Sequence, residues 1–271
     1  MGSSAKVKIG IIGLGKMGEA LVNGLIQSGE NFSIRGSTRS KTTSADAAKR
    51  LGISVGIENR EVVKNSDVLI LCVKPHQAES VLKELSGYLR KNQLLISVCA
   101  SVNTKQLSDW TDGKISVVRA MPNTPCLVRE GMTVFCGGSG VSPSQLKLVE
   151  RIFTTVGKAI AIEESLMDGA TGLSGCGPAY IYLVIEALSE AGVKVGLQRK
   201  TATLLAAQTL VGSAKMVLER GEHPAALKDE VTTPAGCTID GLMALEEGML
   251  RVTLIKAVLA ATNRSKKLSK K

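Results

Sequence analysis

A glycine-rich segment near the N-terminus has the residue types and spacing of a dinucleotide-binding turn. Its residues are Gly13, Leu14, Gly15, Lys16, Met17 and Gly18. An apolar run over 7–12 precedes it and a helical pattern over 16–27 follows, which is the context that the motif requires. Gly13 permits a sharp turn, Gly15 lets a pyrophosphate approach the backbone, and Gly18 lets the helix pack closely on the strand. Because the helix N-terminus also favours an anion, we predict a dinucleotide site, with an ordinary tight turn as the alternative.

The residues after the second strand-like run indicate which dinucleotide binds. An NAD site usually offers Asp or Glu about 20 residues beyond the glycines, and no acidic residue stands there. The chain instead has Ser37, Thr38 and Arg39, followed by Ser40 and Lys41. Hydroxyls and cations of this kind hold a 2′-phosphate through charge-assisted hydrogen bonds. NADPH is therefore favoured over NADH, and an ordinary polar loop is the alternative.

Further candidate cofactor contacts follow strand-like runs, at the carboxyl edge where doubly wound sheets bind ligands. They are Val73, Lys74 and Pro75 after one run, Ala100 after the next, and Asn123 in the turn Met121-Pro122-Asn123-Thr124-Pro125. His76 is a candidate general acid, but a single His after a strand is more often a loop or capping residue. The two prolines around Asn123 also fit a purely structural turn.

Two segments of the C-terminal half have a composition that suits a substrate pocket. Residues 171–180 place three glycines within six residues before a helix, so the backbone there must pass close to another group. Residues 229–238 join two helical patterns and end at Thr238, a predicted N-cap. The amides of Gly236, Cys237 and Thr238 would then form a small nest for a carboxylate. Helix capping alone explains this segment equally well.

The elements that must position these residues change in character along the chain. Strand-like apolar runs alternate with helical patterns in the first part, at 7–12, 32–35, 68–73, 94–99, 115–119, 132–136 and 158–162. A capping box from Ser142 to Gln145, with Pro143 at the first helical position, opens a helix to about Val156. After Glu163 only helical patterns remain, at 177–191, 198–220 and 238 to about 267. We predict an α/β protein with a Rossmann-type doubly wound sheet in residues 1–163 and an all-α domain in residues 164–271.

The pattern over 198–220 is apolar around most of its circumference. A helical domain of this size has limited means to bury such a helix by itself, so it predicts pairing with a second subunit.

The overall composition narrows the classes of partner. The 271 residues carry a net charge of +10, spread along the chain, with one dense basic run over 264–271 that we interpret as a solvated tail. Only 3% of the residues are aromatic, which argues against stacking platforms for single-stranded nucleic acid, and we expect no nucleic-acid partner. The six cysteines lack metal spacing and are expected to be reduced core residues, so we expect no metal. With neither a signal-peptide pattern nor an apolar stretch of bilayer length, we expect a cytoplasmic protein without a membrane contact.

Taken together, these motifs make the chain resemble the pyrroline-5-carboxylate reductase family over nearly its whole length. The segments that carry the resemblance are the glycine turn, Val73-Lys74-Pro75, Met121–Pro125, 171–180 and 229–238. The resemblance implies NADPH-dependent reduction of 1-pyrroline-5-carboxylate, a small cyclic imine carboxylate, to L-proline in the last step of proline biosynthesis. It also implies a homodimer, or a higher assembly of dimers, in which the partner completes each substrate pocket.

The resemblance further implies roles for single residues. The hydroxyl of Thr238 would lie near the imine nitrogen as the catalytic contact, and Thr233, Gly236 and Cys237 would surround the substrate carboxylate. Asn59 and the loop 37–39 would flank the adenosine phosphate.

The chain departs from the family pattern at two places in the inferred pocket. Cys176 stands where relatives usually have a second Ser, and Thr233-Pro234-Ala235-Gly236 stands where they usually have Ser-Pro-Gly-Gly. The resemblance therefore fixes the class of reaction more firmly than the preferred cyclic imine.

Three other functions remain open at this stage. A protonated imine is electrophilic enough to need little acid catalysis, and this fits a chain with only His76 and His223 and no recognisable Ser-His-Asp set. A β-hydroxyacid dehydrogenase would need an acid/base such as Lys194 or Lys215, and neither lies in a glycine-rich motif. The dinucleotide motif is also compatible with a related imine reductase and with a non-catalytic dinucleotide-sensing protein.

Overall fold

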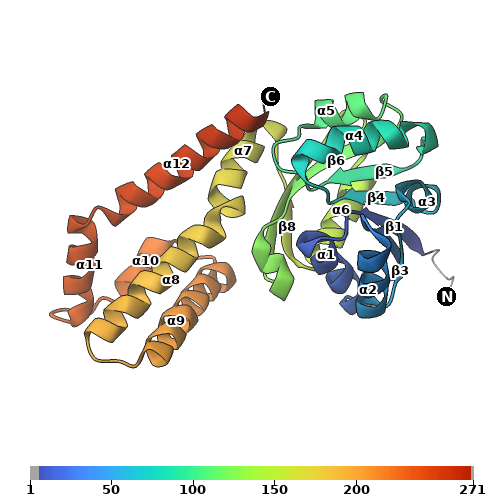
Figure 1. Cartoon of the computed structure of the whole chain (residues 1–271). Helices are drawn as coiled ribbons and strands as arrows, with labels where there is room; N and C mark the ends of the chain where they lie inside the picture. The colour runs from blue at the N-terminus through green and yellow to red at the C-terminus, as the bar shows by residue number, and fades with distance from the viewer. Residues whose placement is uncertain (1–5, 270–271) are drawn as a thin grey trace, which may run out of the picture. The chain divides into compact units, whose positions relative to one another are not determined.

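The computed structural model describes residues 6–269 and consists of two compact units. The sheet unit contains the chain up to Gly175 together with the segment from Ala261 onward, and the helical unit contains Cys176–Ala260 (Figure 1). Residues 1–5 and the last two lysines of the C-terminal basic run lie outside the described residues.

Within the described residues, eight strands form one sheet in the order β3-β2-β1-β4-β5-β6-β7-β8 (Figure 1). The strands are β1 Val7–Ile12, β2 Phe32–Ser37, β3 Ser54–Gly56, β4 Val68–Leu71, β5 Leu94–Ser97, β6 Ser116–Met121, β7 Gly131–Gly137 and β8 Gly157–Ala161. All neighbours are parallel except β6 and β7, which are antiparallel. The predicted doubly wound, largely parallel sheet is confirmed, with β3 and the antiparallel pairing as additions.

Helices cover both faces of this sheet, because its central strands are apolar on both sides. Helices α1 Lys16–Gln27, α2 Lys41–Leu51 and α6 Pro143–Thr154 supply side chains to one core. Helices α3 Asn59–Lys64, α4 Pro75–Leu85 and α5 Thr104–Trp110 supply the other. The predicted capping box opens α6, where Ser142 Oγ accepts from the Gln145 amide and Gln145 Oε1 accepts from the Ser142 amide.

Short turns complete the sheet unit between and after these elements. They are the 3₁₀ turns η1 Ser86–Tyr88, η2 Thr124–Val128 and η3 Glu164–Leu166, the helix α7 Met167–Ala170 and the π-helical turn η4 Thr171–Gly175. π-Helical turns often occur at functional sites, and η4 contains the start of the glycine-rich segment singled out in the sequence.

The rest of the chain is helical, as predicted. The helices are α8 Gly177–Lys194, α9 Arg199–Arg220, α10 Pro224–Glu230, α11 Cys237–Glu247 and α12 Leu250–Ser269. Helices α8 and α9 approach closely at Gly192, where a Cβ would lie 2.7 Å from the Ala202 Cβ. The single helix predicted from 238 to about 267 is wrong, because Met249 has φ of +55° and separates α11 from α12.

The helical unit exposes many large apolar side chains. On α9 only Ala202 and Ala206 are buried, while Leu204 and Leu218 are more than 60% exposed. Among the described residues α9 is also long and apolar enough to cross a membrane, contrary to the expectation from the sequence. Helices of soluble proteins meet the same criteria of length and composition, so α9 does not indicate a membrane protein.

The C-terminal basic segment is helical over its described part, although its basic side chains Arg264, Lys266 and Lys267 are exposed to solvent as predicted. It forms the last turns of α12, in which Ser265 is buried and donates a hydrogen bond to Asp168 at 2.7 Å. The prediction of a free tail is therefore wrong as far as Ser269.

Candidate active site

The glycine turn connects β1 to α1 with the geometry that its sequence predicts. Gly13 has φ of +92°, a conformation that glycine adopts without strain. A Cβ on Gly18 would lie 2.7 Å from the Gly13 carbonyl oxygen, so Gly18 lets α1 pack against the turn. Gly15 differs from both, since it has φ of −94° and open space around the position of a Cβ. Nothing within the described residues requires glycine there, and the open space is compatible with the predicted approach of a ligand to the backbone.

The first turn of α1 is open to an anion. Gly15 is its N-cap and has no side chain, so no side chain caps the first amides. The turn is held in place from β2, because the Gly13 and Leu14 amides both donate to the Ser37 carbonyl oxygen, at 3.2 and 3.0 Å. Lys16 is exposed and Met17 half-buried beside it. These residues fit the pyrophosphate of a dinucleotide.

The strand order reverses between β1 and β4, and this switch point is where doubly wound sheets bind ligands. Val73 follows β4 and packs against the glycine turn, since a Cβ on Gly13 would lie 3.0 Å from Val73 Cγ1. Lys74 is the N-cap of α4 and Pro75 its first residue. Ala100 lies in the loop after β5, next to Ser101 with φ of +62°. The structure thus brings the predicted segments together at one edge of the sheet.

The segment after β2, together with Asn59, presents basic and amide groups that suit a phosphate. Ser37 is buried and its hydroxyl donates to Asn59 Oδ1 at 2.7 Å, which leaves the Asn59 amide group free of hydrogen-bond partners within residues 6–269. The Thr38 hydroxyl donates to the Ser40 carbonyl oxygen at 3.1 Å. Arg39 is exposed and forms no ion pair among the described residues. The Arg39 guanidinium and the Asn59 amide are therefore available as donors, and Lys41 at the start of α2 is likewise exposed, whereas both hydroxyls already donate within the protein.

Asn123 joins the turn after β6 to η4. Its Oδ1 accepts from the Met132 amide at 2.8 Å, and its Nδ2 lies 3.2 Å from the Ser174 carbonyl oxygen. A Cβ on Gly175 would lie 2.9 Å from Met121 Cε, so this glycine also permits a close approach, as the sequence predicts. Asn123 has a structural role; its contact with a cofactor remains a prediction.

Two thiols lie beside the cofactor edge but are poor nucleophiles. Cys99 Sγ lies 3.3 Å from the Val73 carbonyl oxygen. Burial raises the pKa of Cys72 and of Cys99, so both are protonated near neutral pH. All six cysteines are free, and the expectation of six core residues is wrong for Cys237, which is exposed.

The predicted substrate nest lies in the helical unit and forms a tight turn before α11. The Gly236 amide donates to the Thr233 carbonyl oxygen at 3.0 Å, with Pro234 and Ala235 between them. Proline followed by a residue of positive φ is the arrangement of a type II turn, and Ala235 has φ of +58°. A Cβ on Gly236 would lie 2.4 Å from Thr233 Oγ1, so Gly236 also lets the threonine fold over the turn.

Thr238 is not the N-cap of α11. The helix begins at Cys237 and its N-cap is Gly236, which places Thr238 at the second helical position. Because Gly236 has no side chain, no capping hydrogen bond occupies the first amides, and they are available to a carboxylate. Thr238 is half-buried, and within the described residues its hydroxyl makes no hydrogen bond.

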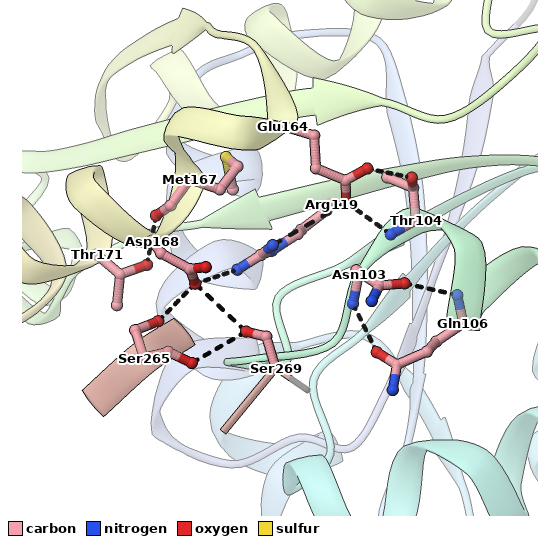
Figure 2. Close-up of polar contacts among 10 residues, drawn as sticks. All are labelled: Asn103, Thr104, Gln106, Arg119, Glu164, Met167, Asp168, Thr171, Ser265 and Ser269. Atoms are coloured by element: carbon pink, nitrogen blue, oxygen red, sulfur yellow. Dashed lines mark hydrogen bonds and ion pairs between the residues drawn. The ribbon is translucent and has the colours of Figure 1, made fainter. Parts of the chain in front are cut away.

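Sequence reasoning missed one polar cluster, around Arg119. This arginine lies in the apolar strand β6, is 4% exposed, and pairs with two carboxylates from the segment after β8 (Figure 2). The sequence feature that could have indicated this cluster is a single charged residue within an otherwise apolar strand. In the described part of the chain, no group of three or more His, Cys, Asp or Glu is placed to hold a metal ion.

Comparison with family models matches both parts of the chain. Residues 164–268 match the model described as pyrroline-5-carboxylate reductase dimerisation. Residues 8–101 match the model described as NADP oxidoreductase coenzyme F420-dependent.

Individual proteins match the chain over nearly its full length. The pyrroline-5-carboxylate reductase of Arabidopsis thaliana is 43% identical over 264 residues, covering 97% of this chain and 95% of the relative. A solved pyrroline-5-carboxylate reductase from Coxiella burnetii has a TM-score of 0.91 at 39% identity and covers 97% of this chain and 98% of its own. The pyrroline carboxylate reductase of Plasmodium falciparum, solved with NADP bound, has a TM-score of 0.86 at 37% identity and covers 98% and 100%.

Proposed function

The chain belongs to the pyrroline-5-carboxylate reductase family, and we propose that it uses NADPH to reduce 1-pyrroline-5-carboxylate to L-proline, the last step of proline biosynthesis. The observation that carries this proposal is the full-length similarity to reductases of this family. The geometry of the two candidate sites supports it, since one suits a dinucleotide and the other a small carboxylate.

NADPH supplies the hydride when bound, and the sheet unit provides the groups to hold it. The open first turn of α1 would bind the pyrophosphate through its amides. Arg39 and Asn59 would hold the 2′-phosphate and would thereby favour NADPH over NADH. The remainder of the cofactor would contact residues at or near the ends of β4, β5 and β6, where doubly wound sheets bind ligands. These residues are Val73, Lys74, Pro75, Ala100 and Asn123.

The turn before α11 would hold the imine acid. The Cys237 and Thr238 amides at the start of the helix suit the substrate carboxylate, with Thr233 and Gly236 shaping the turn around it. The Thr238 hydroxyl would hydrogen-bond the imine nitrogen. The imine nitrogen would take up one proton and the ring carbon would then accept the hydride, so conversion of the neutral imine to the neutral amine would consume one NADPH and one proton. Catalysis rests mainly on positioning, since a protonated imine is already electrophilic.

We propose that residues 164–271 form the substrate-binding and dimerisation domain, and residues 1–163 the NADPH-binding domain. The family match over 164–268 supports the first assignment. The exposed apolar faces of α8, α9 and α11 fit a homodimer or a higher assembly of dimers. We place this assembly in the cytoplasm. No nucleic acid or membrane is needed for this activity.

The test is NADPH oxidation by the purified protein with 1-pyrroline-5-carboxylate, beside its six-membered homologue and beside NADPH alone. We expect one proline formed for each NADPH oxidised. Binding of NADPH without turnover of either imine would instead support a dinucleotide-sensing protein. Oxidation of 3-hydroxy acids with NADP⁺ would support a β-hydroxyacid dehydrogenase.

A further inference from the structure

Arg119 is the most buried charged side chain of the sheet unit that no step of the proposed reaction uses. Its side chain is 5% exposed, and Val117, Val118 and Ala120 around it in β6 are buried. Nη2 lies 3.4 Å from Asp168 Oδ1, and Nη1 lies 4.0 Å from Glu164 Oε1 (Figure 2). A buried charge is costly unless it is paired, and here the two partners come from η3 and α7.

The first carboxylate holds the start of α5. Glu164 Oε1 accepts from the Thr104 amide at 2.7 Å, and Oε2 accepts from the Thr104 hydroxyl at 2.5 Å. Helix α5 begins directly after the loop that contains Ala100, a predicted cofactor contact. Through Glu164, Arg119 is therefore connected to the end of β5.

The second carboxylate holds α7 and the end of α12. Asp168 Oδ1 accepts from the Ser265 hydroxyl at 2.7 Å and from the Ser269 hydroxyl at 3.3 Å. Helix α7 continues into η4, where the Thr171 hydroxyl donates to the Met167 carbonyl oxygen at 2.8 Å (Figure 2). The ion pair with Asp168 thus fixes the segment that leads to Ser174 and Gly175.

These same residues meet the end of β6 again. Asn123 bonds Ser174, and Met121 contacts Gly175, only a few residues beyond Arg119 itself. In a doubly wound fold each half of the sheet binds one half of the dinucleotide. In the proposed binding mode the ends of β1 and β2 would hold the pyrophosphate and adenosine, so the ends of β5 and β6 would serve the nicotinamide half.

We infer that Arg119 is a positioning residue for hydride transfer. It acts through Glu164 and Asp168 and fixes the Ala100 loop, the Asn123 turn and η4 relative to one another. The inference rests on the proposed function for its kinetic consequence, but the coupling among these segments is independent of any substrate. A buried ion pair of this kind is weak evidence for stability, since apolar side chains often pack as well, and this favours a role in geometry.

The test compares Arg119→Met, Arg119→Lys and Glu164→Gln with wild type. The control is Arg90→Met, since Arg90 Nη2 donates to the Ser66 carbonyl oxygen at 2.8 Å and lies 3.9 Å from Asp67 Oδ1, at the amino ends of β4 and β5 and away from the proposed site. We expect Arg119→Met to lower kcat by about tenfold or more, the scale of a small misplacement of reacting groups. The NADPH Kd should change less than kcat, because the proposed pyrophosphate and adenosine contacts are not touched by the substitution. Lys should restore part of kcat because it keeps the charge but not the two-sided contact. Arg90→Met should lower the unfolding midpoint alone.

A second measurement does not depend on turnover. Amide hydrogen exchange at 98–104 and 171–175 should increase in Arg119→Met, while exchange at 13–18 stays at the wild-type rate. Wild-type kcat in both Arg119→Met and Glu164→Gln, or unchanged exchange at 171–175, would overturn the inference. If Arg119→Met does not fold, the Lys and Gln variants decide the question by the same readouts. Absence of turnover in the wild type would count against the proposed function, and exchange would still decide on Arg119.

Discussion

Gly15→Ala separates binding of the dinucleotide from folding of the glycine turn. The backbone at Gly15, with φ of −94° and ψ of −168°, is one that alanine adopts readily, and a Cβ there would meet no heavy atom within 4 Å. In Gly18→Ala the same methyl group would lie 2.7 Å from the Gly13 carbonyl oxygen and 3.3 Å from Ile11 Cγ2. The two substitutions are chemically identical and lie in one motif, so each serves as the control of the other.

The expected change in unfolding free energy follows from these contacts. Alanine at position 15 loses about 0.5–1 kcal/mol as an N-cap relative to glycine, and gains about 0.4–1 kcal/mol from a less flexible unfolded chain. The two effects nearly cancel. Alanine at position 18 forces α1 away from the turn, which costs about 1–3 kcal/mol as overpacking. The affinity for NADPH should respond in the opposite way, with the larger loss in Gly15→Ala. A methyl group at the backbone position closest to the pyrophosphate removes one charge-assisted hydrogen bond, which is worth about 1.5–3 kcal/mol or ten- to hundredfold in Kd.

The assay is chemical denaturation of both variants beside a titration of NADPH followed by its fluorescence. We expect Gly15→Ala to unfold at the wild-type midpoint and to bind NADPH at least tenfold more weakly. Gly18→Ala should show the lower midpoint. Wild-type affinity in a folded Gly15→Ala protein would refute the reasoning, since the pyrophosphate would then not approach the backbone at this turn.

Four further predictions concern the site and the subunit surface. Arg39→Glu should weaken NADPH far more than NADH, because it replaces a phosphate donor with a repelling charge; equal losses in two Kd titrations would contradict this. Activity should fall as the protein is diluted into its dissociation range, and a fully active monomer by light scattering would rule out the obligatory dimer. Thr238→Ser should keep most of the wild-type kcat, whereas Thr238→Val should have a much lower kcat and still bind NADPH with the wild-type Kd. A wild-type kcat in Thr238→Val would mean that the hydroxyl is not needed and that the proton comes from water or from the substrate. Ala235→Val should raise the KM for the imine acid, because a β-branched residue fits poorly at φ of +58°; an unchanged KM would mean that the turn does not hold the carboxylate.

The strands could be predicted where they are buried on both faces. The apolar runs at β4 and β5 correspond to fully buried strands, and the run at β1 to a strand that is buried from Ile9 onward. Strand β3 was missed because it is only three residues long, lies at the edge and has one apolar residue. The antiparallel direction of β7 was also missed, although the connection 122–130 is too short for the crossover that a parallel neighbour needs.

The helix ends were harder to predict than the helices. The patterns for α1, α6 and α9 agree with the structure within about two residues. In the last helical pattern the apolar periodicity continues past Gly248, and only the positive φ of Met249 divides it. Such a break depends on the backbone of one residue, which periodicity does not report.

The start of α11 also differs from the prediction by one residue, and this difference changes which groups are free to bind a substrate. Thr238 was predicted to be the N-cap, and the side chain of an N-cap threonine accepts a hydrogen bond from one of the first amides of its helix. The helix begins one residue earlier, after Gly236, because the turn from Thr233 closes through the Gly236 amide. A glycine N-cap leaves the first amides without a side-chain acceptor and leaves the Thr238 hydroxyl without an internal partner among the described residues. The proposed substrate needs free amides for its carboxylate and a free hydroxyl for its imine nitrogen. The observed turn leaves both without partners in the fold, whereas a capping threonine would have used its hydroxyl on an amide of the helix.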